Sequence, residues 1–355
     1  MNPNIAIIVD YANFGEENNL GGSETWTVEI SKQFMRNNYN VFLFTLNPVW
    51  HWSFSGIQFI PINKLNEFLT YIKFDYIFIS RYIFSSTLNL LKDYPLHKNL
   101  YWIAHDTCIL VDNKELTYDN FKSNDILSNH LNKIICMSDF CKDCIKSQTN
   151  LDDSYFDVIG NGLSISLFNT FDNIFKDNNL FWSSRWERGL ELIVYNILPI
   201  LHRDYPNMKV YVAQYDNKLP DHLKENKDIV FLGQLNKDEL YKEMQKHKVM
   251  FYPNFYPETF CITIIEAAMN DEEIICPLVY GPATTFKQYT SLFPKYNIGY
   301  ESEEDHNKVA NEIKNRIESY YNKDRVLIRK LIKEHIINNY SWESIFNQYK
   351  ERILK

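Results

Sequence analysis

Glycine is scarce in this sequence, with only 10 among its 355 residues. Few backbone positions can therefore adopt the conformations that only glycine tolerates, so a pair of adjacent glycines becomes informative. Long hydrophobic runs are missing too, and no stretch reaches the roughly 18 to 20 apolar residues that a membrane-spanning helix needs. The first residues have no basic region, and their apolar run is too short for a signal peptide. We therefore expect a cytoplasmic protein without a transmembrane segment, while peripheral membrane contact stays open.

An excess of positive charge is also lacking. The 37 Lys and Arg residues are outnumbered by 45 Asp and Glu residues, and the formal net charge is -8. Such a chain lacks the general attraction for phosphate backbones that nucleic-acid binders need, so we predict no nucleic-acid partner. One or two cations in a local cleft could still hold a small anionic ligand. With 45% hydrophobic and 23% charged residues, the composition is typical of a folded protein, and the length predicts two domains.

Six cysteines in a long chain without a signal peptide indicate free thiols rather than disulfides. Cys136, Cys141 and Cys144 have the C-x4-C-x2-C spacing of plant-type iron–sulfur proteins. The alternative is that Cys136 ends a buried strand and the other two lie on the following helix. We prefer this alternative and predict no metal site.

Short apolar runs alternate with helical patterns along the first half of the chain. Most of these runs are continuous, as expected for a parallel sheet covered on both faces. A helix from about 24 to 37 is indicated by Trp26, Ile30 and Phe34, which share one face. We expect strands at 5–9, 41–45, 75–79, 100–103, 133–136 and 156–159.

A second series of strands and helices follows a polar stretch. We expect strands at 180–182, 209–213, 229–232, 249–252 and 274–276, and a helix over 189–204. The predicted fold class is α/β, with two Rossmann-like, doubly wound parallel-sheet domains. Their predicted bounds are 1–168, a linker at 169–179, 180–336, and a tail helix at 337–355. Ligands of such sheets bind at the carboxyl ends of the strands, so we expect the site in a cleft that the two domains face.

The tail helix is indicated by a stripe of apolar side chains, with Ser341 as its N-cap. The stripe consists of Ile337, Trp342, Ile345, Phe346, Tyr349 and Ile353.

Gly21 and Gly22 follow the first strand after a loop and precede the first helix. Two glycines there allow a tight turn and let a phosphate or sugar oxygen approach the helix N-terminus, which carries unpaired N–H groups and a partial positive charge. The alternative is a flexible loop that Ser23 closes as an N-cap. The spacing is not that of the G-x-G-x-x-G fingerprint, so nicotinamide binding is not supported.

Arg185 and Arg188 lie in the turn between the first strand and the longest helix of the second half. Both guanidinium groups can face an anion above the helix N-terminus and bind phosphate oxygens through two bonds each. The alternative is a pair of solvated arginines, one of them paired with Glu187.

Two glutamates and a histidine follow strands at their carboxyl ends. Glu258, in a loop, would face the cleft, and Glu266, on the next helix, could accept hydrogen bonds from a vicinal diol such as a ribose. Both could instead be surface acids. His105 is placed for proton transfer or for contact with a sugar hydroxyl, with a structural role as the alternative.

Taken in this order, the segments resemble glycosyltransferase family 4, whose members have the GT-B fold, over nearly the whole chain. Gly21 and Gly22 match the family's glycine loop, and Arg185 and the Arg188-Gly189 pair match its Arg and Lys-Gly. Glu258 and Glu266 match its E-x7-E motif. The segment 158–162, followed by Phe168, is similar to the end of the family's first domain. The tail helix fits the family's C-terminal helix, which returns to the first domain.

The resemblance implies a metal-independent glycosyltransferase that needs no cofactor. It would move a sugar from a nucleotide-diphosphate sugar to a hydroxyl of a glycan, glycolipid or other glycoconjugate, with retention of anomeric configuration. Arg185 and Arg188 would neutralise the leaving diphosphate in place of a metal, and the amides of Gly21 and Gly22 would approach its phosphates.

The remaining residues would bind the other parts of the donor. The resemblance implies that Glu258 holds the donor sugar near its reacting carbon, that Glu266 holds the ribose, and that His105 touches the donor sugar or the acceptor. Further donor-binding positions would be Thr259, Phe260 and Cys261.

The sequence departs from the family at Cys261, at Ser184 and in the run 270–273. Cys261 stands where the family usually has glycine, which would crowd the donor sugar, and acidic residues replace the usual Gly-x-Pro turn. Two alternatives remain. One is another GT-B activity, such as a nucleotide-sugar epimerase or an inverting transferase. The other is a catalytically silent nucleotide-sugar-binding protein.

Overall fold

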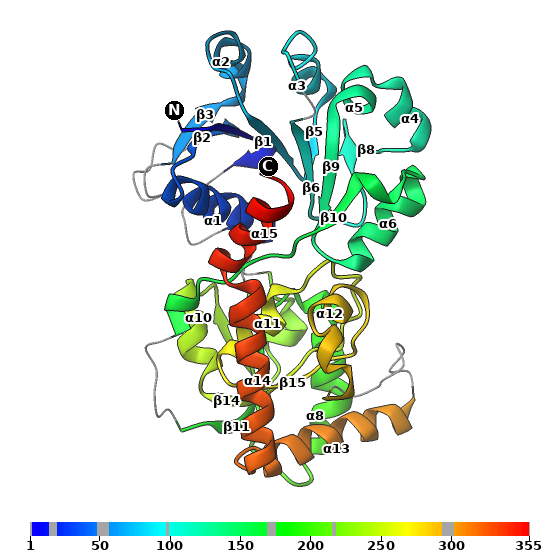
Figure 1. The fold of residues 1–355 in the computed structure, drawn as a ribbon. Coiled ribbons are helices and arrows are strands. Elements are labelled where there is room, and N and C mark those ends of the chain that lie inside the picture. Colours follow the sequence, from blue (N-terminus) through cyan, green and yellow to red (C-terminus); the bar gives the residue numbers. More distant parts are fainter. Residues whose placement is uncertain are drawn as a thin grey trace. The chain divides into compact units, whose positions relative to one another are not determined.

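The computed structural model describes residues 2–13, 20–47, 57–96, 99–168, 175–214, 218–292 and 302–354. It divides into two compact units, each built around its own large sheet (Figure 1). The first unit consists of Met1–Gly162 together with Trp342–Lys355, and the second unit of Leu163–Ser341. The α/β class is confirmed, because both large sheets are formed by parallel strand pairs.

The sheet of the first unit has the strand order β10-β9-β6-β4-β1-β2-β3. Every strand predicted for this half is present. β3 is an additional strand, too short for a clear pattern and ending in a proline, which suits its edge position. The bounds are β1 (Asn4–Asn13), β2 (Asn40–Asn47), β3 (Gln58–Pro61), β4 (Tyr76–Ser80), β6 (Leu100–Ala104), β9 (Leu131–Cys136) and β10 (Phe156–Val158). A small sheet joins β5 (Tyr82–Ile83), β7 (Leu110–Val111) and β8 (Lys114–Glu115).

Two helices from opposite ends of the chain pack together in the first unit. In Figure 1, α15 (Trp342–Arg352, red) lies against α1 (Gly22–Arg36, blue). The rings of Phe34 and Phe346 are 5.9 Å apart between centroids, and Tyr349 is fully buried. The other helices are α2 (Leu65–Tyr71), α3 (Ser85–Asn89), α4 (Tyr118–Ser123), α5 (Asp125–His130) and α6 (Asp139–Thr149).

The predicted tail helix needs a correction at its start. Residues 337–340 belong to α14 (Lys323–Tyr340), and Ile337 is 39% exposed there. Trp342 is the first residue of α15 and covers Gly162 so closely that a Cβ at Gly162 would lie 2.5 Å from the indole. The stripe from Trp342 to Ile353 is buried, as predicted.

The sheet of the second unit has the order β13-β12-β11-β14-β15. All five strands predicted for this half are present. The helix predicted over 189–204 is interrupted by a π-helical turn, since Pro199 has no N–H to donate to the carbonyl of Tyr195. The strands are β11 (Asp177–Trp182), β12 (Val210–Ala213), β13 (Ile229–Gly233), β14 (His247–Phe251) and β15 (Glu273–Ile275). The helices are α7 (Leu190–Leu192), α8 (Leu198–Leu201), α9 (Asp221–Lys224), α10 (Lys237–Met244), α11 (Ile262–Met269), α12 (Tyr280–Thr285), α13 (Glu303–Ser319) and α14.

The linker prediction of 169–179 is wrong at its end, because residues 177–179 belong to β11. The polar residues there anchor that strand. The buried ammonium of Lys176 donates to the carbonyl oxygens of His247 and Asn270, each at 2.9 Å, and Asp177 accepts a hydrogen bond from His247. Residues 169–174 lie outside the described residues.

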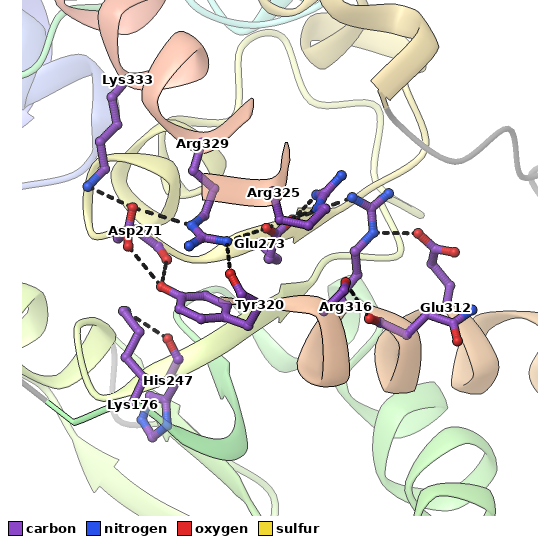
Figure 2. A network of polar contacts seen from close by, with 12 residues as sticks. Lys176, His247, Asp271, Glu273, Glu312, Arg316, Tyr320, Arg325, Arg329 and Lys333 are labelled. Atoms are coloured by element: carbon purple, nitrogen blue, oxygen red, sulfur yellow. Dashed lines mark hydrogen bonds and ion pairs between the residues drawn. The ribbon is translucent and has the colours of Figure 1, made fainter. Parts of the chain in front are cut away.

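Asp271 and Glu273, two acids of the run 270–273, belong to an ion network at β15 (Figure 2). Glu273 is 1% exposed and contacts three arginines, Arg316 of α13 and Arg325 and Arg329 of α14. Asp271 accepts hydrogen bonds from Tyr320 at 2.8 Å and pairs with Lys333 at 2.9 Å. These acids therefore fix α13 and α14 against β15.

Two further sequence predictions concern membranes and metals. Within the described ranges, none of the helices has the length and apolarity needed to cross a bilayer. The Cys141 thiol contacts the carbonyl oxygens of Ala104 and Asp106 at 3.4 and 3.3 Å, and Cys136 is buried at the end of β9. Among the described residues, no three His, Cys, Asp or Glu side chains gather to form a metal site.

Candidate functional site

The turn after β11 is fixed by a glycine. A 3₁₀ turn (Trp186–Arg188) leads from the strand into α7, and Gly189 between them has a φ of 126°. This left-handed value favours glycine, and a Cβ at Gly189 would lie 2.5 Å from the ring of Pro253. The turn that carries the two arginines therefore packs directly on the loop that follows β14.

Arg188 and Glu258 meet across this contact. The Arg188 guanidinium forms an ion pair with Oε1 of Glu258, and the hydroxyl of Tyr252 donates to the same oxygen at 2.8 Å. The Arg188 guanidinium also lies 4.5 Å from the ring centroid of Tyr256. Burial raises the pKa of the Glu258 carboxyl above its ordinary value, although Arg188 and Tyr252 act in the opposite direction. The pair is thus a cation and a carboxylate held together at a sheet edge, with little water around the acid.

Arg185 has a different position. It begins the same turn, and its side chain is exposed, whereas that of Arg188 is only 26% exposed. The structure therefore brings Arg188 into contact with Glu258 and leaves Arg185 at the surface of the turn.

Glu266 lies on α11 and is 3% exposed. Its partners are two residues of α10 that the sequence analysis did not identify. The Tyr241 hydroxyl donates to Oε1 at 2.8 Å, and the Lys237 ammonium forms an ion pair with the same oxygen. In the sequence, the two residues could have been found only by their spacing of four, which puts them on one face of a helix. That spacing is too common to indicate a site by itself.

The segment between the two glutamates is held by α12. Gly281 donates its N–H to the carbonyl of Glu258 at 2.8 Å, and a Cβ there would lie 2.5 Å from the backbone of Thr259. Phe260 is buried and packs edge-on against Tyr340, with 5.5 Å between ring centroids. Phe260 therefore has a structural role, and its role in donor binding stays a prediction.

Cys261 is buried at the N-cap of α11 with a φ of 68° and a ψ of 74°. The backbone therefore keeps a left-handed conformation that glycine adopts easily and cysteine does not.

His105 lies beyond β6, in the first unit. Its Nε2 is 3.2 Å from the Ser80 hydroxyl, and the Trp26 ring packs edge-on against the imidazole, with 5.4 Å between centroids. Removal from water, with a further contribution from the Arg81 guanidinium, lowers the pKa of His105 to about 3. At neutral pH the ring is therefore an uncharged hydrogen-bonding group. The adjacent Asp106 pairs with Arg81 at 2.7 Å.

Gly21 is the N-cap of α1, so the N-cap alternative for Ser23 is wrong. The Glu24 carboxylate turns back over this helix end. Its Oε2 accepts a hydrogen bond from the Ser23 hydroxyl at 3.1 Å, and a Cβ at Gly21 would lie 2.7 Å from that oxygen. Gly22 follows as the first residue of the helix and is exposed.

No family model matches the sequence, and no curated protein matches it. Solved structures do match. A glycosyltransferase from Rickettsia africae is similar with a TM-score of 0.74 and 14% identity, covering 99% of this chain and 97% of that chain. HepE from Anabaena, in complex with UDP-glucose, has a TM-score of 0.66 and 15% identity over 99% of both chains.

A third similar structure is a sucrose-phosphate synthase from Thermosynechococcus elongatus, with a TM-score of 0.65 and 15% identity over 98% of both chains. At such identities the likeness establishes the fold. The chain has the GT-B fold along its whole length.

Proposed function

We propose that the protein is a cytoplasmic, retaining, metal-independent glycosyltransferase of family 4, which moves a sugar from a nucleotide-diphosphate sugar to a hydroxyl of a glycan, glycolipid or other glycoconjugate. The contact between Arg188 and Glu258 carries this proposal. It puts a cation suited to a diphosphate beside a carboxylate suited to sugar hydroxyls, at the carboxyl ends of β11 and β14. The shared fold with HepE, which was solved with UDP-glucose, supports this class of donor.

Arg188 stabilises the leaving nucleoside diphosphate in this proposal. A guanidinium has five N–H donors in a planar fork, so it can bind a phosphate and keep its contact with Glu258. Removal of one such stabilising donor typically costs about 10²–10³ in rate. Arg185, on the same turn, is the second cation.

The carboxylates and the first unit bind the other parts of the substrates. Glu258 accepts hydrogen bonds from the donor sugar, and Glu266 from the ribose. His105 contacts a sugar hydroxyl as a neutral ring, in keeping with its lowered pKa. Gly21 and Gly22 offer their amides to the phosphates, which requires the Glu24 carboxylate to leave the end of α1.

The test is turnover of nucleotide sugars by the full chain. Uridine-, guanosine- and adenosine-diphosphate sugars are offered with hydroxyl acceptors, with and without EDTA, and the products are analysed by NMR. We expect release of nucleoside diphosphate, a glycoside with unchanged anomeric configuration, and the same rate in EDTA.

Three results would contradict the proposal. Inverted configuration would indicate an inverting transferase, and isomerised sugar without transfer would indicate an epimerase. Activity that EDTA abolishes and Mg²⁺ restores would refute the metal-free mechanism.

A further inference from the structure

Glu266 is held from one side only. The two groups that donate to its carboxylate, the Tyr241 hydroxyl and the Lys237 ammonium, both reach Oε1. In the part of the chain that the structure describes, no side chain donates to Oε2. Oε2 is therefore the carboxylate oxygen that is left to accept a hydrogen bond from a ligand.

The two donors are fixed by different means. The Tyr241 ring is 2% exposed and stacks on Phe168, with centroids 4.3 Å apart, so its hydroxyl has a set position. Lys237 is half exposed and is the first residue of α10, next to a capping box in which Asn236 and Glu239 bond reciprocally. Because Lys237 and Tyr241 are four residues apart, they lie on one face of α10 and reach Glu266 together.

We propose that Lys237 and Tyr241 are positioning residues, which orient Glu266 so that it distinguishes a ribose from a deoxyribose in the donor nucleotide. This inference rests on the proposed function. A ribose has two adjacent hydroxyls, and a carboxylate can accept from both when its rotamer is fixed. With Oε1 held by α10, Oε2 faces the ligand, and loss of one ribose hydroxyl removes a hydrogen bond to a charged group.

Lys237 could alternatively touch the donor phosphates, since it is a half-exposed cation at the same edge of the sheet. The two roles differ in what they do to selectivity. A phosphate contact strengthens binding of ribonucleotides and deoxyribonucleotides equally. A contact that orients Glu266 strengthens binding of the ribonucleotide more than binding of the 2′-deoxy form, which has only one of the two hydroxyls.

The experiment measures the dissociation constants of UDP, GDP and ADP and of their 2′-deoxy counterparts by calorimetry on the full chain. We expect the wild-type chain to prefer the ribose form of the nucleotide it binds by at least about tenfold, the effect of one hydrogen bond to a charged group. In Lys237→Met and Tyr241→Phe this ratio should fall to about threefold or less, because binding of the ribose form weakens more than binding of the 2′-deoxy form. Lys237→Arg should restore the ratio.

Lys242→Met is the matched control, because Lys242 is an exposed lysine of the same helix and pairs with Asp238. The ratio of the two dissociation constants in this variant should equal that of the wild type. Thermal unfolding verifies that each variant is folded. Equal weakening of both nucleotide forms in Lys237→Met, or an unchanged ratio, would overturn the inference. If the wild-type chain bound none of the three diphosphates, the proposed function itself would fail, which is a different result.

Discussion

At the residue scale, three of the left-handed backbone positions lie close in sequence to candidate site residues. Arg81, Asn254 and Cys261 have φ values of 72°, 58° and 68° although none is glycine. Arg81 and Asn254 follow the carboxyl ends of β4 and β14, and Cys261 is the N-cap of α11, so the chain turns sharply at each of them. Such conformations cost about 1–2 kcal/mol per residue, so they persist where the surroundings fix them.

Cys261 allows this cost to be measured. Cys261→Gly and Cys261→Ala both remove the thiol, but only glycine relieves the left-handed backbone, so we expect Cys261→Gly to be more stable by about 1 kcal/mol. Chemical denaturation of the two variants gives the difference. Cys144, inside α6, is the control position. There Cys144→Ala should be more stable than Cys144→Gly by about 1 kcal/mol, because alanine is favoured in a helix interior. Equal or greater stability of Cys261→Ala would refute the strain.

Some site residues could be predicted and others could not. Arg188 and Glu258 could be proposed from the sequence because each lies in a loop that follows a predicted strand, in an order that resembles one family. Tyr252 and Lys237 were missed, since their roles come only from contact with these or with Glu266. A tyrosine directly after a strand and a lysine starting a helix are ordinary features of any α/β sequence.

At the scale of elements, the ion network in Figure 2 explains an unusual stretch of sequence. The acids of 270–273 stand where a Gly-x-Pro turn was expected from the family. Glu273, as the first residue of β15, collects arginines from both α13 and α14. The network therefore joins two long helices to the sheet that carries the candidate donor site.

Glu273→Gln tests this role. The substitution keeps the shape of the side chain but leaves three arginines without their buried carboxylate, so we expect a loss of about 3–5 kcal/mol. Glu312→Gln is the control, because Glu312 pairs with Arg316 at a partly exposed position, where the cost should be about 1 kcal/mol or less. Denaturant titration of the full chain measures both. Similar losses in the two variants would contradict the account of Glu273.

Helices and strands could be predicted where the pattern of apolar residues within the segment itself was clear. Buried parallel strands are continuous apolar runs, and those runs located every long strand. β5, β7 and β8 have two residues each, too few for any pattern. The π-helical turn depends on how Pro199 is accommodated within an otherwise helical sequence, which periodicity does not show.

At the scale of the whole molecule, the boundary between the two units differs from the one that the polar stretch predicted. The chain leaves the first unit at Gly162 and returns to it at Trp342. Next to these points, the Leu163 N–H donates to the Tyr340 carbonyl at 2.7 Å. Phe168, predicted to end the first domain, packs on Tyr241 of the second unit. The polar stretch placed the predicted domain boundary too late, because its residues 176–179 begin and anchor β11 and are not part of a linker.

The central claim is that Arg188 stabilises the leaving diphosphate of a nucleotide sugar. The most direct test is the rate of sugar transfer by Arg188→Ala, with Arg203→Ala as control, because Arg203 is an exposed arginine elsewhere in the second unit. We predict that Arg188→Ala lowers turnover at least about tenfold through loss of charge stabilisation, while Arg203→Ala matches the wild type. A rate for Arg188→Ala equal to that of Arg203→Ala would contradict the account.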